Sequence, residues 1–218
     1  MGTATGTHVA REQLAQAARR LAAEGLVVGT AGNLSLRVGD GVATTPTGAV
    51  LRDLTAEQII VVDLDGRPVE GELRPTSELG LHLAIYQELD AGAVVHTHAP
   101  MATAIACVLD ELPVVHYHQL ALGGPVRVGR YETFGTQELA RATLDALDGR
   151  LAALMANHGA ISYGNDLEQA VENSLLLEWL CSLHWHATAL GQPRILNNEQ
   201  QQAVVEAFVR QRYGSKPA

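Results

Sequence analysis

The residues in this sequence best suited to chemistry are two histidines one residue apart, His96 and His98, at the end of the apolar run 93–95. On a strand, side chains two residues apart project from the same face, so the two imidazoles point together. Two nitrogen ligands directed at one point make half of a zinc site. Glu78 and His158 can complete it, because zinc accepts histidine and carboxylate ligands and a catalytic zinc keeps one exchangeable position.

Each of these residues also has an ordinary explanation. A His-x-His pair on a strand is more often incidental than metal-binding, and the sequence contains a second pair, His116 and His118. A carboxylate such as Glu78 is favoured by the dipole at the first turn of any helix. His82 follows four residues later on the same helical face, within reach of Glu78. Spacing alone therefore leaves open which pair, if either, binds a metal.

Small polar turns precede the histidines in the chain. The segment 28–35, Val-Gly-Thr-Ala-Gly-Asn-Leu-Ser, would let backbone amides approach an anion closely, and its threonine, asparagine and serine add side-chain donors. Taken alone, the segment is equally well explained as a turn between a helix and a strand. Together with the donor turns around Gly48 and Ser77, it would suit a phosphate.

A metal beside such turns suggests a reaction class. A Lewis-acid metal can hold a carbonyl oxygen and stabilise the enediolate that forms when the neighbouring carbon loses a proton or breaks a bond. Glu78 is then a candidate general base. With a phosphate bound in the turns, these parts predict cleavage of a carbon–carbon bond in a phosphorylated ketose, or another enediolate reaction on such a substrate. Hydrolysis by metal-bound water is also compatible with the ligand set.

Length and composition predict one domain and no nucleic-acid partner. The chain has 218 residues, 23.2 kDa and 47% hydrophobic residues, enough for one buried core. With 15 basic and 24 acidic residues, its formal charge of -9 argues against binding a nucleic-acid backbone. No apolar run reaches about eighteen residues, and residues 1–7 lack the features of a signal peptide. We therefore expect no membrane partner, a cytoplasmic location, and reduced core thiols at Cys107 and Cys181.

Apolar periodicity and turn residues predict the elements that must position these side chains. Thr7 is a candidate N-cap for the first helix, and Thr76 or Ser77 can cap the helix that carries Glu78. We expect helices over residues 8–25, 78–89, 101–109, 136–147, 166–190 and 198–212. We expect strands over residues 34–38, 42–45, 59–64, 93–98, 114–118 and 151–156. This mixture predicts an α/β sandwich with a mixed, largely antiparallel central sheet flanked by helices.

Seven segments, in their order and spacing, resemble the class II aldolase and adducin head family. They span nearly the whole chain, and although most are weak singly, together they are specific. The segments are 29–35 (GTAGNLS), 45–48 (TPTG), 76–78 (TSE), 95–99 (VHTHA), 116–117 (HY), 133–136 (TFGT) and 157–159 (NHG). Within the family, the resemblance is strongest to members that cleave L-fuculose 1-phosphate. It implies a single three-layer α/β domain over residues 1–218, with flexible ends at 1–7 and 214–218.

The resemblance implies one zinc ion per chain and decides between the two histidine pairs. The family's metal pair matches His96 and His98, and its third histidine matches His158. Glu78 matches the carboxylate that ligates the resting zinc and leaves it to act as acid and base when substrate arrives. His116, like His118, is then expected to have a structural or supporting role.

The resemblance also implies the remaining site residues. Tyr117 matches a tyrosine that enters the site of a neighbouring subunit to protonate the aldehyde oxygen, which implies a homotetramer with active sites at subunit contacts. Thr30, Phe134 and Tyr213 match positions on the aldehyde side. The phosphate cradle matches Gly32, Asn33, Thr47, Gly48, Thr76 and Ser77.

The implied reaction is the reversible cleavage of L-fuculose 1-phosphate, or a closely related ketose 1-phosphate, into dihydroxyacetone phosphate and L-lactaldehyde through a zinc-stabilised enediolate. Alternatives on the same fold are a methylthioribulose-1-phosphate dehydratase and a sugar-acid-phosphate decarboxylase, which keep a glutamate at the position of Glu78. A non-enzymatic adducin-like binding domain is disfavoured, because such heads lack the histidine set that is intact here. His118 replaces a non-histidine residue of the fuculose enzyme beside Tyr117, which bears on aldehyde preference.

Overall fold

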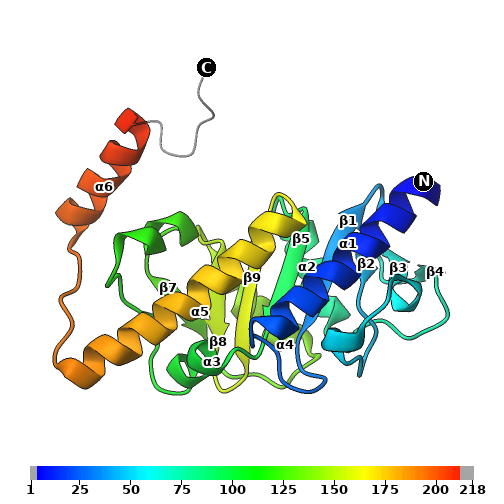
Figure 1. The fold of residues 1–218 in the computed structure, drawn as a ribbon, viewed down its shortest axis with the longest axis horizontal. Coiled ribbons are helices and arrows are strands. Elements are labelled where there is room, and N and C mark those ends of the chain that lie inside the picture. The colour runs from blue at the N-terminus through cyan, green and yellow to red at the C-terminus, as the bar shows by residue number, and fades with distance from the viewer. Residues whose placement is uncertain (1–3, 212–218) are drawn as a thin grey trace.

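A nine-stranded sheet forms the centre of the computed structural model, which describes residues 4–211 and the side chains of residues 6–210 (Figure 1). Its order is β4-β3-β2-β1-β5-β9-β8-β7-β6, and all neighbours are antiparallel except β7 and β8. The mixed, largely antiparallel sheet is thus confirmed. The strands are β1 (Asn33–Val38), β2 (Gly41–Thr44), β3 (Ile60–Asp63), β4 (Pro68–Glu70), β5 (Ala93–Thr97), β6 (Glu111–Leu112), β7 (Val126–Gly129), β8 (Ala152–Met155) and β9 (Gly159–Gly164).

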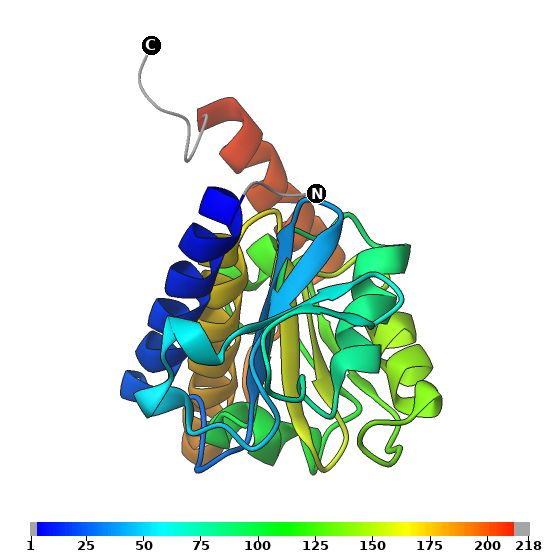
Figure 2. The ribbon, with the colours of Figure 1, turned by 90° about the vertical axis from the view of Figure 1, so that its right-hand side faces the viewer.

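Helices cover both faces of the sheet, which confirms the three expected layers (Figure 2). Helices α1, α3 and α5 pack on one face, and α2 and α4 pack on the other. All six predicted helices form. They are α1 (Ala4–Ala23), α2 (Leu79–Glu88), α3 (Pro100–Ala106), α4 (Gln137–Leu147), α5 (Leu167–Leu190) and α6 (Asn198–Gln211).

Short 3-10 helices complete the described chain, namely η1 (Leu51–Asp53), η2 (Ala56–Gln58) and η3 (Tyr117–Leu122). Helix α6 contacts η3 and stands away from the sheet (Figure 1). Over residues 4–211, no helix combines the length and the hydropathy that a membrane-spanning segment needs.

Strand β5 lies in the middle of the sheet, and its alternate residues contribute to the two halves of the core. Ala93 and Val95 belong to the apolar cluster with α1, α3 and α5, whereas Val94 belongs to the cluster with α2 and α4. Because side chains on a strand alternate between faces, His96 shares the face of Val94. The first histidine of the pair is therefore directed toward the layer that contains α2.

The prediction of a strand over residues 114–118 is wrong. Strand β6 ends at Leu112, and Pro113 has no N–H with which to continue a hydrogen-bonded ladder. His116 is instead the N-cap of η3, and its Nδ1 accepts a hydrogen bond from the His118 amide at 3.2 Å. The tyrosine of this segment therefore lies on a 3-10 helix.

Other departures concern extent and burial. Strands β4, β6, β7 and β9 were not predicted, and β9 is central because it pairs with both β5 and β8. Helix α1 begins at Ala4, so Thr7 lies within it and is not its N-cap. Both thiols are free as expected, but only Cys181 is buried. Cys107 is exposed at the end of α3, so its prediction as a core residue is wrong.

Candidate metal centre

Two neighbouring strands hold β5 at the level of His96. In the sheet register, His96 lies opposite Asn33 of β1 on one side and Ile161 of β9 on the other. Strand β5 ends at Thr97, so His98 lies in the short connection to α3. His96 is fully buried, whereas His98 is partly exposed. The pair thus has one rigidly held member and one nearer the surface.

The third histidine, His158, lies in the tight turn between β8 and β9. Asn157 before it has a φ of 55°, the left-handed conformation that asparagine tolerates better than most residues. At Gly159 after it, a Cβ atom would lie 2.3 Å from the Thr97 carbonyl oxygen. Because glycine has no Cβ, β9 can approach β5 this closely. The Asn-His-Gly sequence therefore brings His158 beside His96.

Glu78 is the N-cap residue of α2, but its carboxylate does not cap the helix. The Thr76 hydroxyl accepts a hydrogen bond from the Glu78 amide at 3.3 Å, where the chain turns into α2. Neither Thr76 nor Ser77 is the N-cap that we predicted. The Glu78 side chain is directed to the end of β5, and Asn33 Nδ2 donates to its Oε2 at 3.0 Å. Capping preference therefore does not explain this glutamate.

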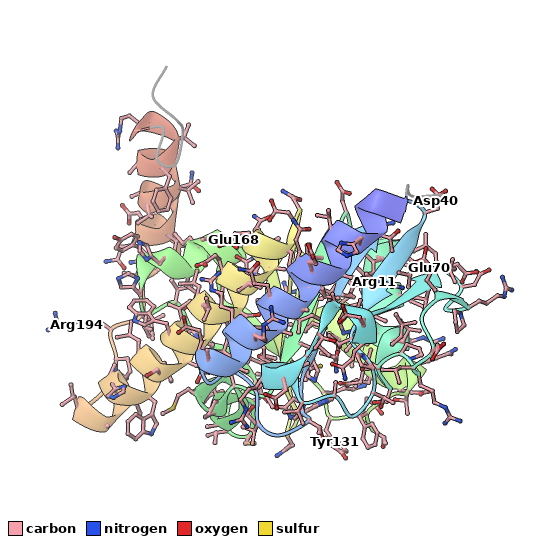
Figure 3. All side chains as sticks on the ribbon, turned by 45° about the vertical axis from the view of Figure 1, so that its right-hand side comes forward. Arg11, Asp40, Glu70, Tyr131, Glu168 and Arg194 are labelled. Carbon is pink, nitrogen blue, oxygen red and sulfur yellow. The ribbon has the colours of Figure 1, made fainter. Side chains whose placement is uncertain are left out.

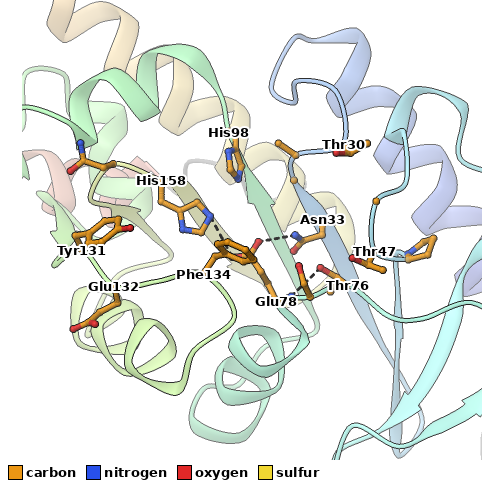
Figure 4. A pocket seen from close by; sticks show the side chains of 16 residues that line it. Thr30, Asn33, Thr47, Thr76, Glu78, His98, Tyr131, Glu132, Phe134 and His158 are labelled. Carbon is orange, nitrogen blue, oxygen red and sulfur yellow. Dashed lines mark hydrogen bonds and ion pairs between the residues drawn. The ribbon is translucent and has the colours of Figure 1, made fainter.

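Four side chains converge on one point, and Figure 4 shows Glu78, His98 and His158 among them. The ligand atoms of these residues and of His96 all lie within 4.8 Å of one another. His96 Nε2 lies 3.0 Å from His98 Nε2 and 3.1 Å from Glu78 Oε2, and His158 Nε2 lies 3.4 Å from Glu78 Oε1. Ligand atoms around a tetrahedral zinc with bonds of about 2.0–2.1 Å stand roughly 3.3 Å apart. The spacing therefore suits one metal ion.

A hydrogen bond determines which nitrogen of His96 can bind a metal. Its Nδ1 lies 2.9 Å from the carbonyl oxygen of Ala160, which can only accept, so Nδ1 carries the proton. In the neutral ring, Nε2 then presents a lone pair toward His98 and Glu78. A carbonyl on the far nitrogen commonly orients a metal-binding histidine in this way. A cation between these electron-rich atoms would stabilise their close approach.

The protonation states at the site also agree with metal binding. Burial by itself raises the pKa of Glu78, but His96, Asn33 and His158 outweigh this effect, so the pKa lies well below its ordinary value. Burial, followed by the neighbouring His96 and His158, lowers the pKa of His98 to about 4. Burial also lowers the pKa of His158. At neutral pH Glu78 is therefore a carboxylate and His98 and His158 are neutral imidazoles, the forms that bind metals.

One buried oxygen supports the same conclusion. Glu78 Oε1 is buried and has no hydrogen-bond partner among the residues that the structure describes. A buried charged oxygen without such a partner is costly, so a ligand for it is expected. Three imidazole nitrogens and one carboxylate oxygen are the ligand set of zinc and related divalent ions. His96, His98, His158 and Glu78 could thus hold a divalent metal.

Three of these residues, Glu78, His98 and His158, border a pocket of about 290 Å³. Residues from the start of β1, the 46–48 turn, the start of α2 and the 131–134 loop surround it (Figure 4). The structure thereby brings together segments that lie far apart in the chain. Eight residues that the family resemblance implied for substrate binding line this pocket, namely Thr30, Gly32, Asn33, Thr47, Gly48, Thr76, Ser77 and Phe134.

Sequence reasoning missed several residues of the pocket wall, including Tyr131 and Glu132. Tyr131 is 62% exposed and lies at the edge of the domain away from α6 (Figure 3). Glu132 Oε1 accepts a hydrogen bond from Arg130 Nε at 2.9 Å. The only sign in the sequence that these two residues belong to the pocket was their position directly before the Thr-Phe-Gly-Thr segment. It did not show how far the loop extends along the pocket.

Two predicted site residues are not placed at this pocket. Tyr117 lies on η3, is 42% exposed, and stacks on the His116 ring with centroids 4.5 Å apart. It does not line the pocket of its own chain. Tyr213 lies outside the described residues. His116 and His118 take no part in the metal-binding cluster.

Replacing His96 should abolish stoichiometric metal binding, because it removes a buried ligand whose orientation the sheet fixes. We expect His96→Ala to lose more zinc affinity than the roughly 10–100-fold that follows loss of a residue that only supports a ligand. His116→Ala is the matched control and should keep its metal. Metal analysis after dialysis, with competition against a chromophoric chelator, measures both. Metal retained by His96→Ala, or lost by His116→Ala, would show that the pairs are misassigned.

Known proteins resemble this chain over most of its length. Residues 12–185 match the family described as class II aldolase and adducin N-terminal domain. A Rhodospirillum rubrum protein named 5-methylthioribulose-1-phosphate/5-deoxyribulose-1-phosphate aldolase is 41% identical over 206 residues, covering 93% of both chains. The L-fuculose phosphate aldolase of Escherichia coli is 40% identical over 187 residues, which are 84% of this chain and 86% of that protein.

The fold agrees with these sequence matches. A solved L-fuculose 1-phosphate aldolase superposes with a TM-score of 0.89 at 33% identity, covering 96% of this chain and 98% of that structure. The metal-binding cluster is intact, as aldolase chemistry of this class requires. The chain therefore belongs to the class II aldolase and adducin N-terminal domain family and is an aldolase-type lyase.

Proposed function

We propose that the chain is a zinc-dependent aldolase that reversibly cleaves a ketose 1-phosphate without a terminal hydroxyl group into dihydroxyacetone phosphate and a short aldehyde. The observation that carries this proposal is the convergence of His96, His98, His158 and Glu78 beside a pocket lined with glycine and hydroxyl turns. The ligands suit a Lewis-acid metal, and the turns suit a phosphate. Together they match the carbonyl group and the adjacent phosphate of a ketose 1-phosphate.

The names of the relatives narrow the substrate class. The R. rubrum protein is named for 5-methylthioribulose 1-phosphate and 5-deoxyribulose 1-phosphate, and the E. coli protein for L-fuculose phosphate. In all three compounds the terminal carbon carries hydrogen or a thioether in place of hydroxyl. Tyr131 and Phe134, which are 62% and 66% exposed, add apolar surface to the pocket wall. We infer that these rings receive the apolar end of the substrate.

The phosphate group is assigned to the turns at Gly32 and Gly48 and to the start of α2. Both glycines have positive φ, of 94° and 70°, a conformation that glycine adopts readily where the backbone must come close to a ligand. Thr47, Thr76 and Ser77 add hydroxyl groups to the same pocket. Since α2 begins within two residues of Ser77, the positive end of its dipole also favours an anion there.

Glu78 is assigned the proton transfers. A divalent metal held by the three histidines would supply the Lewis acid that polarises the substrate carbonyl. Glu78 then removes the proton from, or returns it to, the carbon beside that carbonyl. Asn33 holds one of its oxygens, and the other is available to a ligand.

A substrate panel tests the reaction. Zinc-loaded protein should release dihydroxyacetone phosphate from one or more of L-fuculose 1-phosphate, 5-deoxyribulose 1-phosphate and 5-methylthioribulose 1-phosphate, as measured with a coupled reductase. Ribulose 1-phosphate is the matched control, because it differs from its 5-deoxy counterpart by one hydroxyl group, and it should react more slowly. Loss of water without dihydroxyacetone phosphate would indicate the dehydratase. Carbon dioxide from a sugar-acid phosphate would indicate the decarboxylase.

Glu78→Gln should separate proton transfer from metal binding. The three histidines remain, so we expect the variant to fold and to keep much of its zinc. Loss of the general base should slow exchange of the dihydroxyacetone phosphate proton with solvent deuterium by about 10²–10⁴-fold. Nuclear magnetic resonance measures the exchange without any aldehyde present. Exchange at the normal rate in the variant would remove Glu78 from this role.

Tyr117 is proposed to act in the pocket of an adjacent subunit. Its exposure of 42% and its absence from the pocket of its own chain support a role across a subunit contact. The family resemblance supplies the role, protonation of the aldehyde oxygen, and the assembly, a homotetramer. Two more aromatic rings lie near the same surface. Trp179 packs against the His116 ring, and Phe208 lies beside the Tyr117 ring.

Tyr117→Phe should therefore suppress cleavage but leave proton exchange on dihydroxyacetone phosphate, which needs only the metal and Glu78. General acid groups typically contribute about 10²–10⁴-fold to such a step. Mixing dissociated Tyr117→Phe and Glu78→Gln chains should restore part of the activity, because some contacts combine both intact residues. Mixed oligomers without recovered activity would show that Tyr117 acts within its own chain or not at all.

A further inference from the structure

A continuous chain of buried polar side chains leads from the metal-binding cluster into the core. Asn33 Nδ2 donates a hydrogen bond to Glu78 Oε2, and Asn33 Oδ1 lies 2.6 Å from His82 Nε2. His82 Nδ1 lies 2.7 Å from Ser35 Oγ, which lies 2.9 Å from the Tyr86 hydroxyl. His82 and Ser35 are completely buried, and the other members are at most 7% exposed. We call these five residues the buried chain.

Helix and strand geometry explain why these residues meet. Glu78, His82 and Tyr86 are spaced four residues apart, so they lie along one face from the N-cap of α2 onward. Asn33 and Ser35 are two residues apart on β1, so they share the face that α2 covers. The sequence placed His82 beside Glu78, but the structure connects the two through Asn33.

The chemistry of the groups gives the buried chain a direction. The Asn33 carbonyl oxygen can only accept, so His82 Nε2 must carry a proton and donate it. The other nitrogen of neutral His82 must then accept, so Ser35 donates to Nδ1. Ser35 in turn is left to accept from the Tyr86 hydroxyl. Every hydrogen bond in the buried chain thus points from Tyr86 toward the metal-binding cluster.

His82 is suited to remain neutral in this position. Burial lowers its pKa to about 3, and the nearby His96 lowers it as well, while Glu78 acts in the opposite direction. Both ring nitrogens already have partners in the neutral form. The donor at Nε2 is therefore permanent near neutral pH.

We propose that His82 is a positioning residue for the metal centre, because its Nε2–H fixes the amide orientation of Asn33 and thereby the placement of the Glu78 carboxylate. With Oδ1 held by His82, Asn33 can present only Nδ2 to Glu78 Oε2. A flipped amide would place Oδ1 about as close to the carboxylate, and the two acceptors would repel. The correct amide leaves Glu78 Oε1, which has no hydrogen-bond partner within the described part of the chain, free for the metal.

The tautomer of His82 can be measured in the unmodified protein. Long-range proton–nitrogen spectra of the labelled protein should show His82 as the neutral Nε2–H form from pH 6 to pH 8, both with and without zinc. A neutral Nδ1–H form would reverse the direction of the buried chain and overturn the proposal. A charged ring over this range would do the same.

Zinc affinity tests whether the tautomer matters to the site. His82→Leu removes the donor at similar volume, and zinc affinity should fall by about 10–100-fold, the usual effect of losing a residue that orients a ligand. His82→Gln, which can donate from its own Nε2, should recover most of this loss. In the Asn33→Ala background, His82→Leu should have little further effect, because His82 acts through Asn33.

A matched control separates positioning from general loss of stability. Ser174 is also buried. Its hydroxyl group lies 2.6 Å from Ser162 Oγ, and neither serine belongs to the metal-binding cluster. Ser174→Ala should therefore leave zinc affinity unchanged, even where thermal unfolding shows some destabilisation. Unchanged affinity in His82→Leu, an additive loss in the double variant, or an equal loss in Ser174→Ala would each overturn the proposal.

The inference rests on the metal site of the proposed function but not on its substrate. The tautomer and the zinc affinities are measured without any ketose phosphate. If the protein shows these effects but cleaves none of the panel substrates, the role of His82 would stand and the proposed reaction would be wrong. If His82→Leu does not fold, the spectra of the unmodified protein and the His82→Gln variant still decide the outcome.

Discussion

The structure depends most on one buried carboxylate. A charged group in the interior is tolerated only when it is paired and hydrogen-bonded, and among the described residues only one of the two Glu78 oxygens accepts a hydrogen bond. Asn33 donates to one oxygen, while His96 and His158 lie within 3.4 Å of the two oxygens. Because Glu78 Oε1 has no hydrogen-bond partner among the described residues, a cation held between the histidines and the carboxylate would complete the pairing. The start of α2, the end of β5 and the β8–β9 turn are therefore held in one arrangement by a shared electrostatic requirement.

The central sheet meets this requirement through its strand order. Strand β5 lies between β1 and β9, so His96 has Asn33 on one side and the strand that follows His158 on the other. Each neighbour contributes through its backbone or a side chain, and the left-handed Asn157 and the missing Cβ at Gly159 allow the closest approach. The ligand set thus combines His96 on a strand with three residues in short connections or at a helix start, which the neighbouring strands hold rigidly. Such rigidity suits a site that must keep its geometry through a reaction.

The site also reconciles an acidic protein with an anionic substrate. The chain carries a formal charge of -9, yet the pocket gathers amide and hydroxyl donors and the start of a helix on the side away from the histidines (Figure 4). Charges more than about 8 Å away are screened at physiological salt, so local donors outweigh the global charge. The polar pocket and the buried chain behind it have different roles. In our proposals, the pocket contacts the substrate and the buried chain keeps the carboxylate in place.

The sequence by itself determined the ligand types, the six helices and the class of fold, because apolar periodicity, glycine turns and His-x-His spacing are local signals. It could not choose between His96–His98 and His116–His118 by spacing, and its strand over 114–118 failed because Pro113 stops the ladder. The resemblance to the class II aldolase and adducin head family selected His96 and His98. Only the tertiary structure decided that β9 pairs with β5, that Asn33 bonds Glu78, and that Tyr131 borders the pocket. These are contacts between segments far apart in the chain, and such contacts depend on strand order and packing that no local pattern records.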